Sequence, residues 1–155
     1  MKKVDQQNAP LRQGSSYPQP YGEPCAARRR RRLGDAAGLT GFGVNLLTLP
    51  PGAWSSQRHW HSDEDEFVFV VSGVVTLITE AGEEAMKAGD CAGFKAGDPD
   101  GHHLVNRSDA QAVVLEIGTN SKDDRCVYSD IDMVAEPGEH HFRRKSGAPY
   151  PKARS

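Results

Sequence analysis

Hydrophobic residues in the middle of the chain fall into short runs rather than into a helical repeat. From about Phe42 these runs are rich in Val, Leu, Phe, Thr and Ile, and each is closed by Gly, Pro, Asp or Asn. This composition is typical of β-strands bounded by turns, and the short connections between the runs favour hairpins. We expect strands at residues 42–49, 66–71, 74–79, 83–86, 91–94, 102–106 and 112–118.

The strand pattern predicts an all-β domain. No window of about a dozen residues in this region has the period of 3.6 that an amphipathic helix requires, so parallel βαβ units are not expected. An antiparallel sandwich or barrel over residues 25–134 is predicted instead, with one further strand around Cys126–Met133. Residues 1–24 are expected to form a flexible arm, or one ordered only against another subunit, because they are polar and rich in Pro. Residues 135–155 are expected to be a polar tail.

Charge and composition indicate which classes of binding partner and which cellular location to expect. The 155 residues carry a net charge of -2, so no overall basic field would attract nucleic acid or an anionic membrane. No apolar run approaches the roughly 18 residues of a membrane span, and the N-terminus lacks the apolar stretch of a signal peptide. Cys25, Cys91 and Cys126 are odd in number and far apart, which argues against a disulfide framework. A cytoplasmic protein is therefore expected.

Candidate metal ligands are concentrated around residues 59–66. In a strand, His59 and His61 would point to the same face, about 7 Å apart along the chain, so both can bind one metal. Glu66, at the start of the next apolar run, could add a carboxylate oxygen. The sequence GHHLVN at residues 101–106 offers a third imidazole, from either His102 or His103. Imidazole nitrogens with a carboxylate oxygen suit a first-row transition metal.

Two groups of residues resemble, in order and approximate spacing, the two motifs of the cupin superfamily. They are Gly52, His59, His61, Glu66 and Gly73, then Gly89, Asp90, Gly97, His102 and Asn106. The first group has one extra residue after its first glycine. In the second, Lys95 stands where the family usually has Pro, and two extra residues precede the histidine, so the loop there is expected to differ in shape.

The resemblance covers residues 42–118 and implies a small jelly-roll barrel, a double-stranded β-helix, with extended N- and C-terminal arms. It also implies that His59, His61, Glu66 and His102 bind a divalent transition metal, with Mn, Fe, Ni and Zn left open. His102 and His103 would face opposite sides of a strand, so one of them is the ligand. The three-residue spacing to Asn106 favours His102.

The resemblance further implies that the barrel binds a small oxygen-rich molecule. The chain is similar to small single-domain bacterial cupins, some of them labelled sugar-phosphate isomerases, and we expect such an activity, with the metal polarising the substrate carbonyl. A non-catalytic binding or regulatory module and a metal-dependent dioxygenase are the alternatives. A homodimer is expected because a second copy can cover the sheet edges of a small barrel.

The run of five arginines at residues 28–32 has two interpretations. Five like charges could contact phosphates, but no recognition motif or aromatic platform accompanies them. An exposed arm or edge strand, in which charge discourages aggregation, is the favoured interpretation. Nucleic acid is therefore not expected as a partner.

Overall fold

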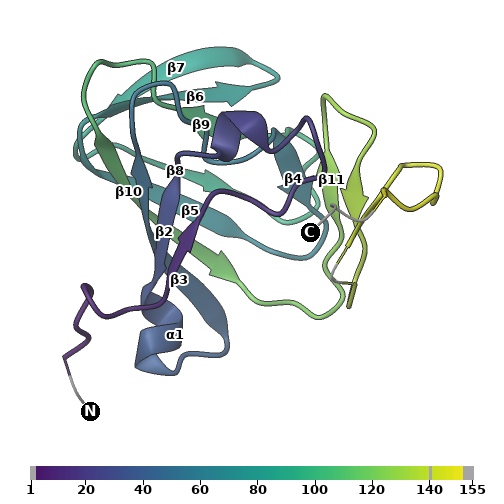
Figure 1. The fold of residues 1–155 in the computed structure, drawn as a ribbon, viewed down its shortest axis with the longest axis horizontal. Helices are drawn as coiled ribbons and strands as arrows, with labels where there is room; N and C mark the ends of the chain where they lie inside the picture. Colours follow the sequence, from purple (N-terminus) through teal and green to yellow (C-terminus); the bar gives the residue numbers. More distant parts are fainter. Residues whose placement is uncertain (1–2, 140, 152–155) are drawn as a thin grey trace.

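Three antiparallel sheets form the fold in the computed structural model, which describes residues 3–139 and 141–151. Their strand orders are β1-β2-β3-β10-β5-β8, β7-β6-β9 and β13-β12-β11-β4. Figure 1 shows β6, β7 and β9 above the large sheet, with β4 and β11 at one end of the barrel. The strands are β1 (Leu11–Gln13), β2 (Arg29–Arg32), β3 (Phe42–Leu49), β4 (His59–His61), β5 (Glu66–Ser72), β6 (Val74–Thr79), β7 (Gly82–Lys87), β8 (Cys91–Phe94), β9 (His103–Val105), β10 (Ala112–Thr119), β11 (Cys126–Tyr128), β12 (Val134–Ala135) and β13 (Phe142–Arg143).

The predicted all-β jelly-roll fold is confirmed, and each predicted strand has a counterpart. Within the described residues, helical structure is confined to the 3-10 turn η1 (Glu23–Cys25) and the short helix α1 (Leu33–Ala37). The strand expected at 102–106 is shorter, because His102 forms an isolated bridge with His59 and β9 begins one residue later.

The N-terminal segment contains regular structure that its composition did not indicate. Strand β1 pairs along its length with β2 and extends the large sheet. Its three residues are all exposed, so backbone hydrogen bonds rather than apolar burial hold it in place. Farther along, Tyr17 packs edge-on against Tyr128, with ring centroids 5.5 Å apart.

The interpretation of the arginine run as an exposed arm or edge strand is corrected by the sheet order. Strand β2 lies between β1 and β3 and pairs with both. Alternate side chains therefore point to opposite faces of the sheet. Arg30 lies opposite Leu47, which is fully buried, so Arg30 points into the barrel.

The barrel core lies between the large sheet and the sheet of β6, β7 and β9. Strand β5 shows how the alternation builds it, since Val68 and Val70 are buried whereas Phe67 and Phe69 are exposed. Glu66 belongs to the inward set of the same strand. The buried core residues are Leu47, Leu49, Ala53, Val68, Val70, Val75, Leu77, Met86, Leu104, Ala112 and Val114.

Gly73 closes the hairpin between β5 and β6 in a backbone conformation that favours glycine. Its φ is 78°, and a Cβ atom there would lie 2.8 Å from the backbone of Ala112. Gly52 has nearly the same φ, 79°, but a Cβ atom there would meet nothing within 4 Å. The two positions thus separate backbone strain from steric conflict.

We expect Gly52→Ala to lower the free energy of unfolding by about 1 kcal/mol, since it adds only left-handed strain. Gly73→Ala should cost about 1–3 kcal/mol more, because the new methyl group collides with a neighbouring strand. Urea unfolding followed by circular dichroism measures both values. Equal destabilisation of the two variants would contradict the close approach at Gly73.

Candidate metal centre

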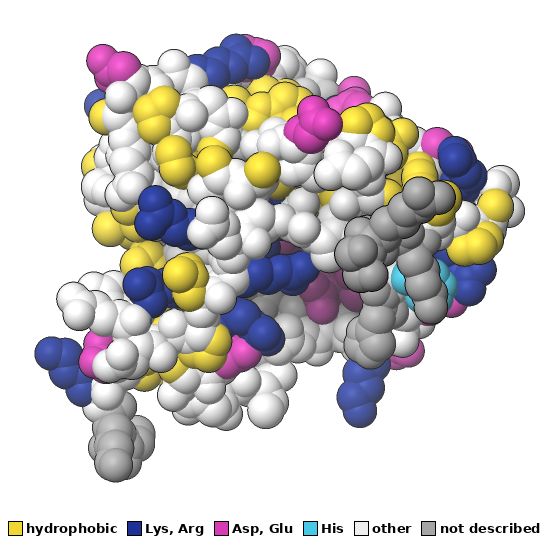
Figure 2. All heavy atoms as spheres, in the orientation of Figure 1, with side chains coloured by type: hydrophobic (Ala, Val, Ile, Leu, Met, Phe, Trp, Pro, Cys, Tyr) yellow, Lys and Arg dark blue, Asp and Glu magenta, His cyan; other side chains and the backbone are white. Residues whose placement is uncertain are grey.

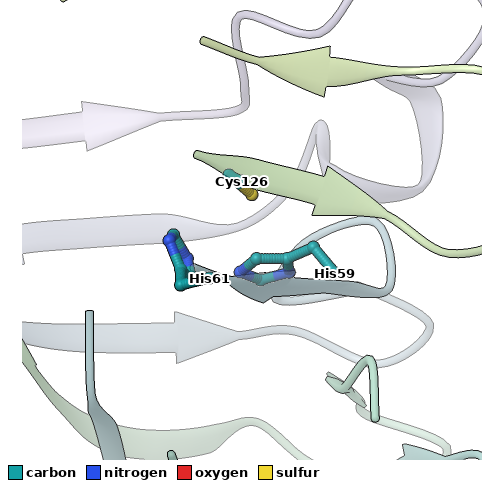
Figure 3. A group of neighbouring side chains, drawn as sticks. All are labelled: His59, His61 and Cys126. Carbon is teal, nitrogen blue, oxygen red and sulfur yellow. The ribbon is translucent and has the colours of Figure 1, made fainter. Parts of the chain in front are cut away.

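Four polar side chains from three segments of the barrel meet at its inner face. His59 and His61 lie on β4, and Cys126 of the paired strand β11 lies beside them (Figure 3). Glu66 begins β5 and points inward on the same side as Val68 and Val70. The bridge between His59 and His102 brings the fourth side chain alongside. The structure thus brings together all four residues predicted from the sequence.

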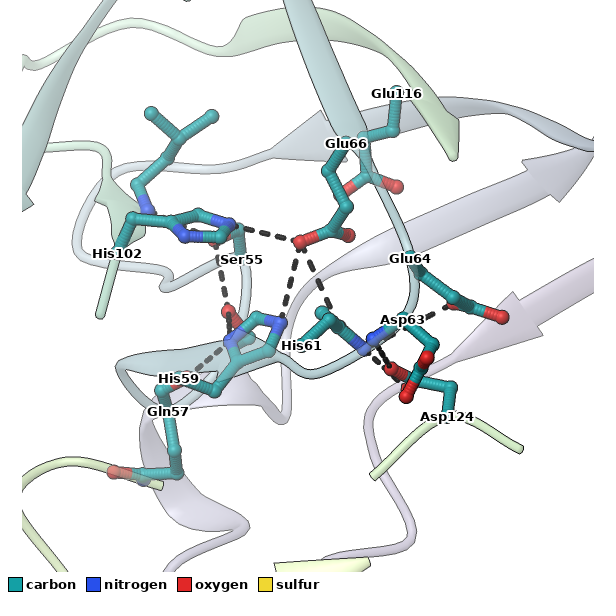
Figure 4. A network of polar contacts seen from close by, with 12 residues as sticks. Ser55, Gln57, His59, His61, Asp63, Glu64, Glu66, His102, Glu116 and Asp124 are labelled. Atoms are coloured by element: carbon teal, nitrogen blue, oxygen red, sulfur yellow. Dashed lines mark hydrogen bonds and ion pairs between the residues drawn. The ribbon is translucent and has the colours of Figure 1, made fainter. Parts of the chain in front are cut away.

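The Glu66 carboxylate is the centre of this group. Its Oε2 atom lies 2.9 Å from Nε2 of His102, 3.6 Å from Nε2 of His61 and 3.7 Å from Nε2 of His59. Figure 4 shows the three imidazoles directed at that oxygen. The three Nε2 atoms thus lie close to one carboxylate oxygen. This set of nitrogen and oxygen donors is of the kind that binds first-row transition metals.

Two of the imidazoles are oriented by acceptors on their other nitrogen. Nδ1 of His59 lies 2.9 Å from the carbonyl oxygen of Gln57, and Nδ1 of His61 lies 2.6 Å from Oδ2 of Asp124. In the neutral form of each ring, Nδ1 donates its proton there, which leaves Nε2 with a lone pair directed at the centre. Metal-binding histidines are usually held in this way, so the residues fit a metal ion.

His102 and His103 are separated by the structure as strand alternation requires. The His102 ring stacks on Phe94, with centroids 3.4 Å apart, and its Nε2 faces Glu66. His103 is buried on the other side, with Nδ1 2.9 Å from the carbonyl oxygen of Ser56 and its ring edge-on to Trp54. His102 is therefore the one that joins the group.

The electrostatics of the group follow from burial and from these contacts. Burial lowers the pKa of His59 to about 3, so its imidazole is neutral. Burial also opposes protonation of His61, but the hydrogen bond to Asp124, the neighbouring Cys126 and the charge of Glu66 together outweigh it and raise the pKa of His61 to about 11. The histidines around Glu66 lower its pKa to about 2 despite its burial. Glu66 is thus ionised, and a metal ion would compete with the proton on His61.

Asp124 and Cys126 are site residues that sequence reasoning missed. Asp124 lies between β10 and β11, and with Glu64 it could form a second small group around His61. The Cys126 sulfur lies close enough to His59 and His61 to act as a ligand as well. No spacing pattern links the segment after residue 119 to the histidines, since only the pairing of β11 with β4 brings them together.

Comparison with known proteins identifies the family. Residues 45–118 match the model of the cupin domain. The chain is also 45% identical to a sugar phosphate isomerase of the cupin superfamily from Silicibacter pomeroyi, with a TM-score of 0.91 and 97% of each chain covered. The chain belongs to the cupin superfamily. Because the similarity extends over almost the whole chain, it includes the segments on either side of the cupin barrel.

Other solved structures are similar to this cupin at lower sequence identity and lower TM-score. A structure from Acidithiobacillus ferrooxidans, described as a proposed sugar phosphate isomerase, is 29% identical over 83% of each chain, with a TM-score of 0.72. A proposed oxalate decarboxylase from Thermotoga maritima is 17% identical, with a TM-score of 0.62 over 77% of this chain and 100% of that one, and shows the fold alone. A search of curated proteins found no match.

The candidate site of this cupin lies where two cavities meet. One cavity, of about 290 Å³, is also lined by Arg28, Arg30 and Glu116. The other, of about 280 Å³, is also lined by Trp60 and Lys95. His61, Glu66, Phe94 and His102 line both. Each volume is near the lower end of about 300–1,000 Å³ for small-molecule sites, which matches a small ligand beside the candidate site.

No helix in the described part of this cupin is both long and apolar enough to cross a membrane.

Proposed function

We propose that this cupin binds one divalent metal ion through His59, His61, Glu66 and His102 and acts as a sugar-phosphate isomerase. The observation that carries the proposal is the convergence of three Nε2 atoms and the Glu66 carboxylate at the wall of a small, polar cavity. The full-length similarity to a sugar phosphate isomerase supports the substrate class.

A bound divalent metal would supply a Lewis acid that polarises a carbonyl oxygen of the substrate. The protein's own part is to hold the donors still. Gln57 and Asp124 fix the rings of His59 and His61, and the stacked Phe94 fixes that of His102. Phe94 also lines both cavities, where it contributes an apolar side chain to the wall.

Isomerisation between an aldose and a ketose suits such a cavity. The reaction moves one proton between two adjacent carbons and one between the oxygens that they carry, within one molecule, so it needs neither a second substrate nor an external oxidant. The cavity lining supplies hydrogen-bonding groups for sugar hydroxyls, among them Asn45, Ser56 and Thr119. The nitrogen and oxygen donor set accommodates Mn, Fe, Ni or Zn.

Turnover of aldose and ketose phosphates with three to six carbons tests this function. We expect NMR in deuterated water to show interconversion and deuterium uptake at the carbon beside the carbonyl, with protein loaded separately with Mn, Fe, Ni and Zn. His59→Ala should lower kcat/KM at least about 100-fold, because the loss of a metal ligand removes several kcal/mol of transition-state stabilisation. The exposed His141 gives a matched control, since His141→Ala should leave turnover unchanged.

The alternatives are separated by the same screen. Consumption of dioxygen with diketone or catechol substrates, without isomerisation, would favour a metal-dependent dioxygenase. Absence of any product with every metal would replace the enzyme with a non-catalytic binding or regulatory module.

We further propose that a second copy of the chain covers the outer face of the large sheet. The outward residues of β5, Phe67, Phe69 and Val71, are 41%, 38% and 48% exposed. On the neighbouring strand β10, Leu115 lies opposite Phe69 and Ile117 opposite Phe67, so the apolar side chains continue across the sheet. Contiguous exposed apolar surface of this kind typically marks an interface.

Phe69→Glu should convert a dimer into a monomer at micromolar concentration, because a charge would be buried against the partner copy. Light scattering measures the mass. Leu39→Glu is the matched control, since Leu39 is 42% exposed but follows α1 outside the sheet face. A native protein that is monomeric, or a dimer that Phe69→Glu leaves intact, would refute this interface.

A further inference from the structure

Arg28 is a buried cation of the barrel that has no acidic partner among the residues that the structure describes. It is only 5% exposed and lines the same cavity as the candidate metal site. Its Nε donates to the carbonyl oxygen of Gly14 at 3.0 Å, and its Nη1 donates to the carbonyl oxygen of Ser55. Among the residues that the structure describes, Nη2 donates no hydrogen bond, and no carboxylate lies within 4 Å of the guanidinium.

The other charges at this cavity are already compensated. Arg30 makes two hydrogen bonds with Glu116, of 2.7 and 2.9 Å. Glu66 faces the three histidines, and the Glu64 carboxylate lies 3.9 Å from Nδ1 of His61 and accepts a hydrogen bond of 2.8 Å from the backbone nitrogen of Ser121. Figure 2 shows basic and acidic side chains together in a hollow on this face of the molecule. Among the charged residues that line this cavity, Arg28 is therefore the one without an oppositely charged neighbour in the described part of the chain.

A buried charge without a counter-charge destabilises the fold, and binding of an oppositely charged ligand removes part of that cost. The two carbonyl oxygens that Arg28 contacts are neutral, and the Tyr17 ring, 5.8 Å from the guanidinium carbon, offers only a weak cation–π contact. Burial lowers the pKa of Arg28, and the neighbouring Arg30 lowers it further. An arginine stays protonated even so. Arg28 therefore offers a positive charge that can bind an anion.

We propose that Arg28 binds the anionic oxygens of the substrate, in the first instance a phosphate group, and so sets the specificity of the cavity for phosphorylated ligands. This inference rests on the proposed function for the identity of the substrate, but the anion site itself does not require the metal. A guanidinium suits this role because its N–H groups match the oxygens of phosphate or carboxylate. The reactive end of the ligand would lie toward the histidines, in the same cavity.

Binding of inorganic phosphate to metal-free protein tests the proposal without relying on activity. Isothermal titration calorimetry in EDTA, at constant ionic strength, should show phosphate binding that Arg28→Gln weakens at least about 10-fold, since a charge-assisted hydrogen bond contributes about 1.5–3 kcal/mol. Arg28→Lys keeps the charge and should retain part of the affinity. Arg107→Gln is the matched control, because Arg107 pairs with Glu83 on the exposed surface, away from the cavity.

A parallel titration with acetate separates the two sources of anionic oxygens. Acetate binding that Arg28→Gln weakens, with no phosphate binding, would overturn the preference for phosphate. Equal phosphate affinity in the native protein, Arg28→Gln and Arg107→Gln would overturn the anion site.

A wild-type measurement covers the case in which Arg28→Gln does not fold, since Arg28 also ties Gly14 to Ser55. Phosphate should shift the Nε–H resonance of Arg28 in a ¹⁵N correlation spectrum, and an unmoved resonance would refute the proposal. The readouts also separate this inference from the proposed function. Phosphate binding by the His59→Ala/His61→Ala variant without turnover supports the anion site alone. Turnover of sugar phosphates with a KM that Arg28→Gln leaves unchanged supports the enzyme and refutes the role of Arg28.

Discussion

The burial of one carboxylate is the constraint on which the candidate site depends. Glu66 points into the barrel because it shares the inward face of β5 with Val68 and Val70. A buried ionised carboxylate is costly unless opposite charge or donors surround it. The Nε2 atom 2.9 Å away on His102, with those of His59 and His61 slightly farther, supplies that surrounding. A divalent metal would satisfy the same carboxylate and the three imidazoles at once.

Strand alternation also sends neighbouring arginines of residues 28–32 to opposite faces of the large sheet. Because β2 lies inside the sheet, a uniform stretch of sequence becomes two sets of side chains with different surroundings. Arg30 pairs with Glu116 inside the barrel, whereas Arg31, in the opposite set, donates an exposed hydrogen bond of 2.6 Å from Nη1 to the carbonyl oxygen of Gln7. Arg28 is the inward member that no acid neutralises in the described chain, which is why it, rather than the run as a whole, becomes the candidate anion site.

The sequence was informative wherever apolar alternation or a local motif was present. Strands β3 and β5 to β10 follow from hydrophobic runs and turn residues, whereas β4 has no apolar run and was not among the expected strands. The spacing of His59, His61 and Glu66 anticipates their convergence. Strand β1 could not be predicted in this way, because its exposed residues carry no apolar pattern. Asp124 and Cys126 were also missed, since their proximity to the histidines depends on the long-range pairing of β11 with β4. The inward direction of Arg28 follows from alternation along the chain into β2, whose long-range pairing with β3 the sequence does not indicate.

The central claim is that the four side chains around Glu66 hold one metal ion. Elemental analysis of protein purified without an affinity tag or chelator tests it most directly, beside His59→Ala/His61→Ala, His102→Ala and His103→Ala. The account predicts about one metal ion per native chain, lost in the first two variants and retained in His103→Ala, because His103 faces Ser56 and Trp54. A native protein that contains no metal, and takes up none from Mn, Fe, Ni or Zn, would contradict it.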